Sequence, residues 1–231
     1  TQPLCDNRRM DIAQLIQTIA LYALPVLFAI TIAEAARGYV ANYFGDKTAE
    51  SLGRLSLNPA KHIDPFGTIL IPLILFFATS GAFLFGSAKP IPIRFGNLRK
   101  PKTDFIWVEL AGPLANLIMA FFWGFASYAL QAAGITEPFL AKMCQAGFSV
   151  NVSLFAFLLF PLPPLPGGRI LVGLLPRRQA ELLSKIEPWG FFVVMALIIA
   201  GVLTSFWLRP VMTLAFGLLN ILLSPLAMLI N

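Results

Sequence analysis

Long apolar segments limit what this chain can fold into more than any other feature of its sequence. They cover residues 12–44, 68–86, 105–131, 141–160, 188–207 and 210–230. A helix of about twenty apolar residues crosses the roughly 30 Å hydrocarbon core of a bilayer and satisfies its own backbone hydrogen bonds there. With 58% apolar and only 12% charged residues, the composition is that of a membrane protein. The sequence predicts an all-α polytopic membrane protein with about six transmembrane helices.

Residues 1–9 differ in character from the rest of the chain. Met10 is a plausible coding start, so we expect residues 1–9 to be a tag or an extension. Residues 10–231 are expected to form a single integral membrane domain. Cys5 and Cys144 are too few for a disulfide framework and do not have the spacing of metal ligands.

The net charge of +6 indicates how the chain lies in the membrane. If six spans place the loops alternately on the two sides, eleven lysines and arginines share the side of the N-terminus and six lie on the other. Positively charged loops stay in the cytoplasm, so this count predicts a cytoplasmic N-terminus. Since no basic stripe with stacking aromatic residues is present, we expect contact with the lipid bilayer, including anionic lipid, and no nucleic-acid partner.

A polar cluster, AEAAR at residues 33–37, interrupts the first apolar segment. A charged side chain inside hydrocarbon costs roughly 2.5 to 3.5 kcal/mol on insertion scales, so such groups are candidates for function. Glu34 and Arg37 are three residues apart, which allows a structural ion pair on one face of a helix. Because this segment is longer than a span requires, we expect its helix to continue toward the interface and to end at Gly45.

Three stretches with several prolines separate or interrupt the apolar segments. Residues 57–67 are polar and contain two prolines, and residues 88–94 have proline at alternate positions, which predicts a re-entrant segment or an edge strand. The third stretch, residues 160–169, has four prolines within six positions where an apolar segment is running. Non-helical backbone at membrane depth is tolerated only inside the protein or beside a wet cavity, so we expect this stretch to face an internal site.

These motifs, in this order, resemble those of the site-2 protease family of intramembrane zinc metallopeptidases. They are Glu34 on the first helix, LGRLSLNPAKHIDPFG at residues 52–67, AKPIP at 88–92, AGPLAN at 111–116 and PLPPLPGGR at 161–169. The resemblance covers residues 10 to about 176 and is greatest for the short bacterial branch without a PDZ domain. It implies a protein of the bacterial inner membrane, with a three-helix core in residues 10–176 and additional helices, acting as scaffold or lateral gate, in residues 188–230.

The resemblance also assigns positions to a zinc site. The family carries His-Glu-x-x-His on its first helix, where histidines one turn apart hold zinc and the glutamate is the general base. An aspartate in a Leu-Asp-Gly-Gly motif is the third ligand, and the metal lowers the pKa of a bound water. In this chain the ligand positions are Ala33, Arg37 and Pro166, the catalytic general-base position is Glu34, the substrate-binding position is Asn116, and Leu158 replaces a further asparagine.

None of the three ligand positions retains a zinc ligand. Alanine has no donor atom, arginine stays cationic, and proline offers only a carbonyl group. We therefore predict no zinc site in this sequence, although zinc is the cofactor of the family, and a catalytically inactive protein, a pseudoprotease. Its expected partners are transmembrane peptide segments of membrane proteins.

Two other functions stay open from the sequence alone. In the first, the parent form of the sequence is an active intramembrane zinc metalloendopeptidase. In the second, the chain is an ion-coupled carrier or channel that uses Glu34 and Arg37. No internal repeat is visible, which disfavours a carrier built from inverted halves. His62, the only histidine, is expected to anchor a loop through a hydrogen bond rather than to bind a metal.

Overall fold

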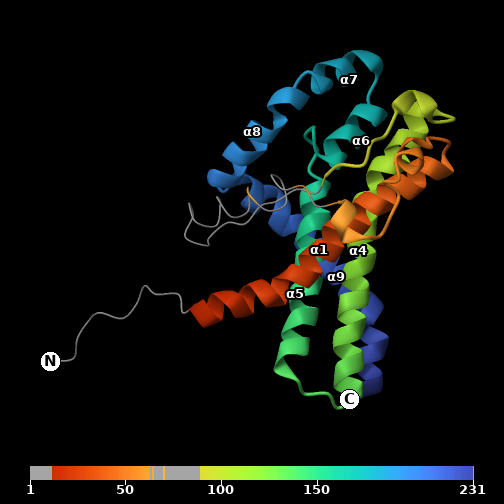
Figure 1. Ribbon diagram of the computed structural model, residues 1–231. Helices are drawn as coiled ribbons and strands as arrows, with labels where there is room; N and C mark the ends of the chain where they lie inside the picture. The colour runs from red at the N-terminus through yellow and green to blue at the C-terminus, as the bar shows by residue number, and fades with distance from the viewer. Residues whose placement is uncertain (1–11, 63, 65–69, 71–88, 231) are drawn as a thin grey trace.

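The computed structural model describes residues 12–62, 64, 70 and 89–230, and every regular element in them is a helix (Figure 1). The elements are α1 (Ile12–Tyr43), α2 (Thr48–Ser51), η1 (Pro59–Lys61), η3 (Phe95–Asn97), α4 (Pro101–Ala132), α5 (Pro138–Leu158), α6 (Pro166–Leu174), α7 (Arg177–Ser184), α8 (Glu187–Ile199), η4 (Thr204–Leu208) and α9 (Arg209–Ile230). The prediction of an all-α protein is confirmed for this part of the chain. Residues 1–9, expected to be a tag or an extension, lie outside it.

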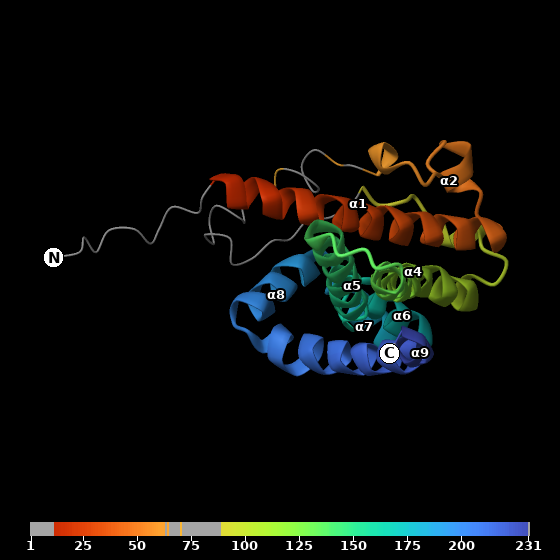
Figure 2. The ribbon, with the colours of Figure 1, turned by 90° about the horizontal axis from the view of Figure 1, so that it is seen from below.

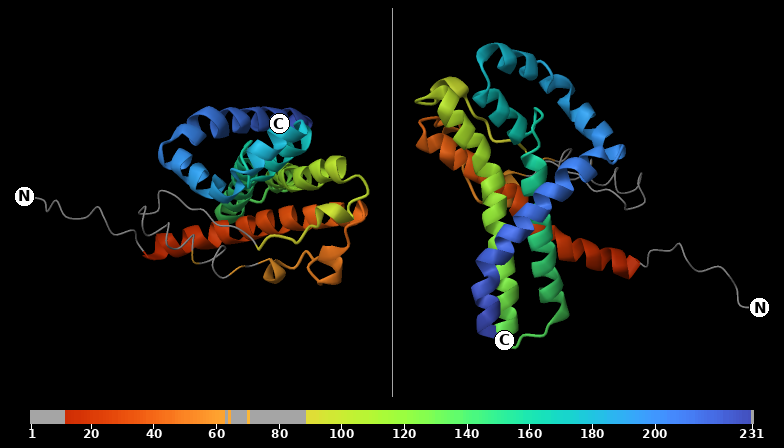
Figure 3. Two further views of the ribbon diagram at one scale, coloured as in Figure 1. Left: turned by 90° about the horizontal axis from the view of Figure 1, so that it is seen from above. Right: turned by 180° about the vertical axis from the view of Figure 1, so that it is seen from behind.

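Three helices, α1, α4 and α5, pack on one another at the centre of the molecule. α1 lies on one side of α4 and α5, while α8 and α9 lie on the other side (Figure 2). α9 runs along α4 and also contacts α5, and α6 packs on α4 (Figure 3). Membrane helices approach closely where side chains are small. A Cβ atom at Gly112 of α4 would lie only 3.1 Å from Cδ of Arg37, so this glycine allows α4 to pack directly against the Arg37 side chain of α1.

Three helices of the described chain are long and apolar enough to cross a membrane: Gln17–Tyr43, Pro101–Ala132 and Thr204–Leu226. A fourth crossing is added if α7 and α8, which are bent by 66° relative to each other, form one broken span. The six predicted spans are therefore not confirmed.

The differences have local causes. The predicted span at residues 141–160 is helix α5. Its mean hydropathy is below that of a membrane-crossing helix, because it carries polar side chains such as the exposed Lys142 and Gln145. The predicted span at residues 188–207 is broken, because α8 ends at Ile199 and Gly201 has a φ of 70°. Glycine adopts this left-handed conformation readily and commonly ends helices. Apart from residue 70, the predicted span at 68–86 lies outside the described residues.

Helix α1 ends where the sequence predicted. Gly45 has a φ of 110°, and the backbone N–H groups of Gly45 and Asp46 donate to the carbonyl oxygens of Asn42 (3.0 Å) and Ala41 (2.9 Å). These bonds satisfy carbonyl groups of the last helical turn, as in common glycine C-caps. The predicted end of the first helix at Gly45 is confirmed.

The edge strand predicted near residues 88–94 is wrong for residues 89–94, which are extended but pair with no other strand in the described chain. The backbone N–H of Ile91 donates to Oε2 of Glu34 (2.9 Å), and that of Arg94 donates to Oδ2 of Asp46 (2.6 Å). Carboxylates on and just after α1 thus accept the hydrogen bonds that a neighbouring strand would have accepted. The re-entrant alternative stays a prediction, because residues 71–88 lie outside the described part.

Asp46 ties together the segments at the C-terminal end of α1. Besides Arg94, its carboxylate accepts hydrogen bonds from the backbone N–H of Thr48 (3.1 Å) and from Nδ2 of Asn97 (3.0 Å). Burial alone would raise the pKa of this carboxyl group, but the hydrogen bonds from Thr48, Arg94 and Asn97 outweigh it and hold the pKa of Asp46 below its usual value. Asp46 is therefore a carboxylate at neutral pH.

The two basic stretches that follow α1 lie at the same end of the helix bundle. The backbone N–H of Arg99 donates to the carbonyl of Phe44, and the guanidinium of Arg54 donates to the carbonyl of Lys89, each at 3.0 Å. Alternating loops would place residues 45–62 and 89–102 on opposite sides of the membrane, and these contacts show that this alternation is wrong. We call this surface the basic end; its lysines and arginines are Lys47, Arg54, Lys61, Lys89, Arg94, Arg99, Lys100 and Lys102.

Candidate functional site

A cavity of about 350 Å³ lies where α1, α4, the end of α5 and the start of α6 meet. Every position that the family resemblance assigned lines it: Ala33, Glu34 and Arg37 from α1, Asn116 from α4, Leu158 from α5, and Pro166 from α6. These residues are up to 133 positions apart in the sequence (33 to 166), so only the packing of the core helices brings them together. We call this the central cavity.

The proline stretch forms one wall of the central cavity. Pro164, Leu165 and Pro166 line it, and α6 begins at Pro166, where proline suits the first turn of a helix. The two glycines that follow are required by close packing. A Cβ atom at Gly167 would overlap the carbonyl of Leu159, and one at Gly168 would overlap the backbone of Pro163. Non-helical backbone thus borders an internal cavity, as the proline pattern predicted.

Arg37 points its guanidinium group between two carboxylates. Nη1 lies 3.0 Å from Oε1 of Glu34, and Nη2 lies 2.8 Å from Oε1 of Glu109 on α4. The predicted pair between Glu34 and Arg37 is therefore confirmed, but Arg37 has a second and more deeply buried partner. The side chain of Glu109 is only 1% exposed.

Two further residues, Arg169 and Glu187, extend this cluster toward the start of α8. Nη1 of Arg169 lies 3.5 Å from Oε1 of Glu109, and Nη2 of Arg169 lies 2.6 Å from Oε1 of Glu187. We call the five residues Glu34, Arg37, Glu109, Arg169 and Glu187 the charge chain. It runs from the buried contact between α1 and α4 to the partly exposed start of α8, and it contains three carboxylates and two guanidinium groups.

Sequence reasoning missed Glu109, although a signal was available. Glu109 lies within the apolar segment 105–131, and an ionisable residue inside a transmembrane segment is a candidate for function by the same rule that marked Glu34. Arg169 was noticed as part of the proline motif but not as a partner of a buried carboxylate.

Both carboxylate oxygens of Glu34 are engaged by donors. Nη1 of Arg37 lies 3.0 Å from Oε1 and 3.2 Å from Oε2, and Oε2 also accepts the backbone N–H of Ile91. A general base needs its free oxygen within reach of the proton that it abstracts. In this arrangement Glu34 instead holds α1 to the extended segment 89–94.

The residues around the central cavity do not fit a zinc ion. Zinc takes four ligands drawn from thiolate, imidazole and carboxylate groups at about 2.0 to 2.3 Å. At the three ligand positions the structure has a methyl group (Ala33), a guanidinium group (Arg37) and a pyrrolidine ring (Pro166). The guanidinium group occupies the space between Glu34 and Glu109 and would repel a second cation.

His62 lies away from the central cavity and has a structural contact. Its side chain is fully buried, and its Nε2 is 2.7 Å from the carbonyl oxygen of Ser56, to which the ring N–H donates. The carbonyl of His62 also accepts the backbone N–H of Lys89 (2.8 Å). The predicted loop-anchoring hydrogen bond is confirmed.

Asn116 is a buried polar residue whose side-chain amide is unpaired within the described part of the chain. The residue is fully buried and lines the central cavity, and neither its amide oxygen nor its amide nitrogen has a hydrogen-bond partner in the described chain. An unpaired amide in an apolar setting costs free energy, so such groups normally bond across helices or to a ligand. The substrate-binding role of Asn116 stays a prediction that this environment supports.

The sequence is similar to two curated bacterial proteins. It is 38% identical over 192 residues to "Putative zinc metalloprotease YwhC" of Bacillus subtilis (strain 168), which covers 81% of this chain and 83% of the relative. It is 30% identical over 193 residues to "Putative zinc metalloprotease Rip2" of Mycolicibacterium smegmatis (strain ATCC 700084 / mc(2)155), which covers 80% of this chain and 69% of the relative. No protein-family model matches the chain, and no solved structure matches it.

Proposed function

The chain belongs to the site-2 protease family, and from this membership we propose that it is a non-catalytic member that binds transmembrane segments of other membrane proteins. One observation carries the proposal. Where the family holds a metal ion, Arg37 lies between Glu34 and Glu109, with Ala33 and Pro166 at the remaining ligand positions. Without a metal to activate water, Glu34 has no nucleophile to deprotonate.

The central cavity supports binding of an apolar peptide. Ile30, Leu154, Phe157 and Leu165 provide apolar walls, and Asn116 provides one unpaired amide. Its volume of about 350 Å³ is at the lower end of the range of ligand sites in proteins. The side-chain amide of asparagine can both donate and accept hydrogen bonds, so Asn116 is suited to the backbone N–H and C=O of a helix end or an unwound turn.

This proposal is tested with purified protein in lipid nanodiscs and a fluorescent peptide that carries one transmembrane segment. We expect saturable binding without cleavage, and no zinc in stoichiometric amount by metal analysis. Replacing Asn116 by leucine removes one or two hydrogen bonds worth about 1 kcal/mol each, so the peptide affinity is expected to fall by about five- to thirtyfold.

A matched control is Gln145→Leu, which removes an exposed amide from α5 outside the cavity and should leave the affinity unchanged. Cleavage of the peptide that disappears in Glu34→Gln, together with one zinc per chain, would overturn the proposal.

The protein is an integral membrane protein, and we further infer that its basic end lies in the cytoplasm of a bacterial cell. Lysine and arginine near membrane helices are retained on that side, and the basic end carries eight of them. α1 ends at this surface, so its first turn, at Ile12, lies on the opposite side of the membrane. This orientation replaces the cytoplasmic N-terminus predicted from alternating loops.

The orientation is tested by labelling single cysteines with a membrane-impermeant maleimide, in a background of Cys5→Ser and Cys144→Ala. Thr136→Cys, beyond the far end of α4, is expected to react in intact spheroplasts, whereas Glu50→Cys in α2 is expected to react only after lysis. The opposite pattern would place the basic end outside.

A further inference from the structure

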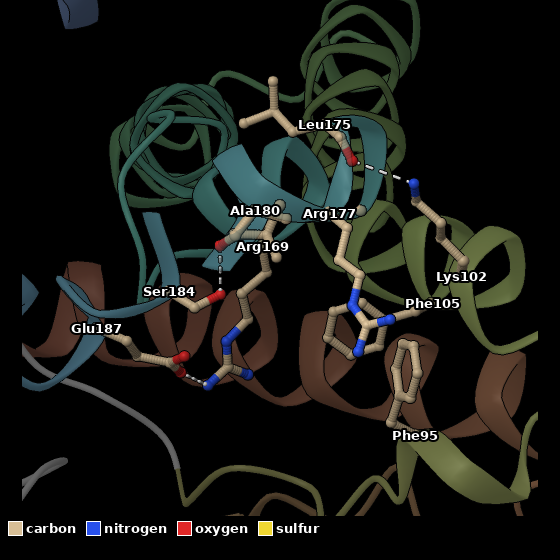
Figure 4. Close-up of a pocket in the computed structure, with 11 residues that line it drawn as sticks. Phe95, Lys102, Phe105, Arg169, Leu175, Arg177, Ala180, Ser184 and Glu187 are labelled. Atoms are coloured by element: carbon tan, nitrogen blue, oxygen red, sulfur yellow. Dashed lines mark hydrogen bonds and ion pairs between the residues drawn. The ribbon is translucent and has the colours of Figure 1, made fainter. Parts of the chain in front are cut away.

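A second cavity, of about 590 Å³, lies between the N-terminal part of α4, α6 and α7 (Figure 4). The cavity adjoins the basic end, because Lys102 belongs to both. Nζ of Lys102 donates to the carbonyl oxygen of Leu175 at 3.1 Å. It shares only Arg169 with the residues around the central cavity. None of the positions assigned by the family resemblance lines it, and the proposed function does not involve it. We call it the interfacial cavity.

The walls of the interfacial cavity are largely apolar. Phe95 and Phe105 pack edge to face with ring centroids 5.4 Å apart, and Val172, Leu175 and Ala180 complete the surface. Phe95 remains 50% exposed despite its size. An exposed phenylalanine in a hollow of this volume favours an apolar ligand, because burying it removes apolar surface from water.

Three cations line the same cavity and one carboxylate accompanies them. Lys102, Arg169 and Arg177 come from three different helices, and Glu187 pairs with Arg169 at 2.6 Å. Figure 4 shows Lys102 and Arg177 on the side of Phe95 and Phe105, away from the pair of Arg169 and Glu187. The lining therefore carries an excess of positive charge on its aromatic side.

The cations on the aromatic side are open to an anion. Lys102 is exposed and its recorded partner is an uncharged carbonyl oxygen. Arg177 is 94% exposed and pairs with Glu181 on the same helix, and an exposed pair of this kind is weak. Both side chains can therefore exchange a weak partner for a phosphate group.

The change in composition between α7 and α8 favours a position of this cavity at the depth of lipid headgroups. α7 is rich in charged and polar residues, whereas α8, beyond the 66° bend, is almost entirely apolar and carries the exposed Trp189 in its first turn. Tryptophan is enriched at membrane interfaces, and amphipathic helices lie in the plane of the interface. The cavity beneath α7 is thus positioned where the headgroup and the first methylene groups of a lipid are found.

We propose that the interfacial cavity binds one anionic phospholipid. The phosphate contacts Lys102 and Arg177, and an acyl chain covers Phe95, Phe105 and Val172. A zwitterionic headgroup is disfavoured, because its cationic part would meet a lining that already has an excess of positive charge. Free inorganic phosphate offers the same charge but leaves the apolar wall exposed.

The test uses the full chain in detergent micelles with added phosphatidylglycerol or phosphatidylcholine, and native mass spectrometry counts the lipids retained. Phosphatidylglycerol is expected to be retained at least tenfold better than phosphatidylcholine. The double variant Lys102→Gln/Arg177→Gln is expected to lose this preference. Val172→Trp, which fills the cavity and keeps the cations, is expected to lower retention as well.

The matched control is Arg178→Gln/Lys185→Gln, which removes the same charge from exposed positions outside the cavity and should keep the preference. An equal loss in both double variants would mean that lipid binds only to the general positive surface, and it would overturn the site. Complete displacement of the lipid by an equal concentration of inorganic phosphate would show that the cavity binds a free anion, and it would overturn the proposal of a lipid ligand. Failure of phosphate to displace it supports the proposal.

Discussion

Replacing Arg37 by methionine is expected to lower the free energy of unfolding by about 3 to 5 kcal/mol, because it leaves Glu109 buried beside Arg169 alone, at 3.5 Å. Methionine keeps most of the volume of the arginine stem, so the loss is mainly electrostatic. Thermal or denaturant unfolding in detergent, followed by circular dichroism, measures the change. The central residue of the charge chain is thus predicted to be essential for the fold.

Two controls separate the buried charge from the loss of the side chain itself. The double variant Arg37→Met/Glu109→Gln removes both charges of the buried contact and is expected to recover most of the stability. Arg177→Met breaks an exposed pair with Glu181 and is expected to change stability by less than about 1 kcal/mol. A loss below about 1 kcal/mol for Arg37→Met would show that Glu109 is not left as an unpaired buried charge.

Restoring a zinc site is expected to require Glu109→Gln in addition to substitutions at the three ligand positions. Ala33→His, Arg37→His and Pro166→Asp place two imidazoles and a carboxylate at positions that already line the central cavity. The three changes alone also remove the arginine that neutralises Glu109, so the three-residue variant is expected to be unstable. With Glu109→Gln added, we expect a folded protein that takes up one zinc per chain and cleaves a transmembrane peptide.

The restored activity should depend on Glu34. Adding Glu34→Gln to the four-residue variant is expected to leave zinc uptake intact and to lower the cleavage rate at least a hundredfold, as is typical when a general base is lost. Zinc content by plasma mass spectrometry and peptide cleavage by gel electrophoresis report the two properties separately. A folded four-residue variant without zinc would contradict the assignment of the ligand positions.

Local features of the fold were predictable from the sequence. The end of α1 at Gly45 and the pair of Glu34 and Arg37 depend on residues a few positions apart, and glycine conformation and helix periodicity decide them. The positions around the central cavity followed from the order of the motifs, which carries information on the tertiary contacts of a family.

Features that depend on long-range contacts were not predictable. The partner of Arg37 is 72 residues away on α4, and no local pattern connects the two. The alternating prolines of segment 89–94 indicate an extended backbone but not its hydrogen-bond partners. The acceptors of its backbone N–H groups are the carboxylates of Glu34, on α1, and Asp46, just after α1. Apolar length also failed to show that Gly201 divides the segment 188–207, because hydropathy does not record backbone conformation.

The contact between Arg37 and Glu109 makes the effect of a substitution at either residue depend on the other. Changing Arg37 first passes through a protein with an uncompensated buried charge, whereas changing Glu109 first leaves Arg37 paired with Glu34 and the fold intact. A substitution of Arg37 therefore has a different effect with glutamate and with glutamine at position 109. A histidine at position 37 is therefore expected to destabilise the protein when residue 109 is glutamate and to be tolerated when residue 109 is glutamine, because only the first case leaves a buried charge unpaired.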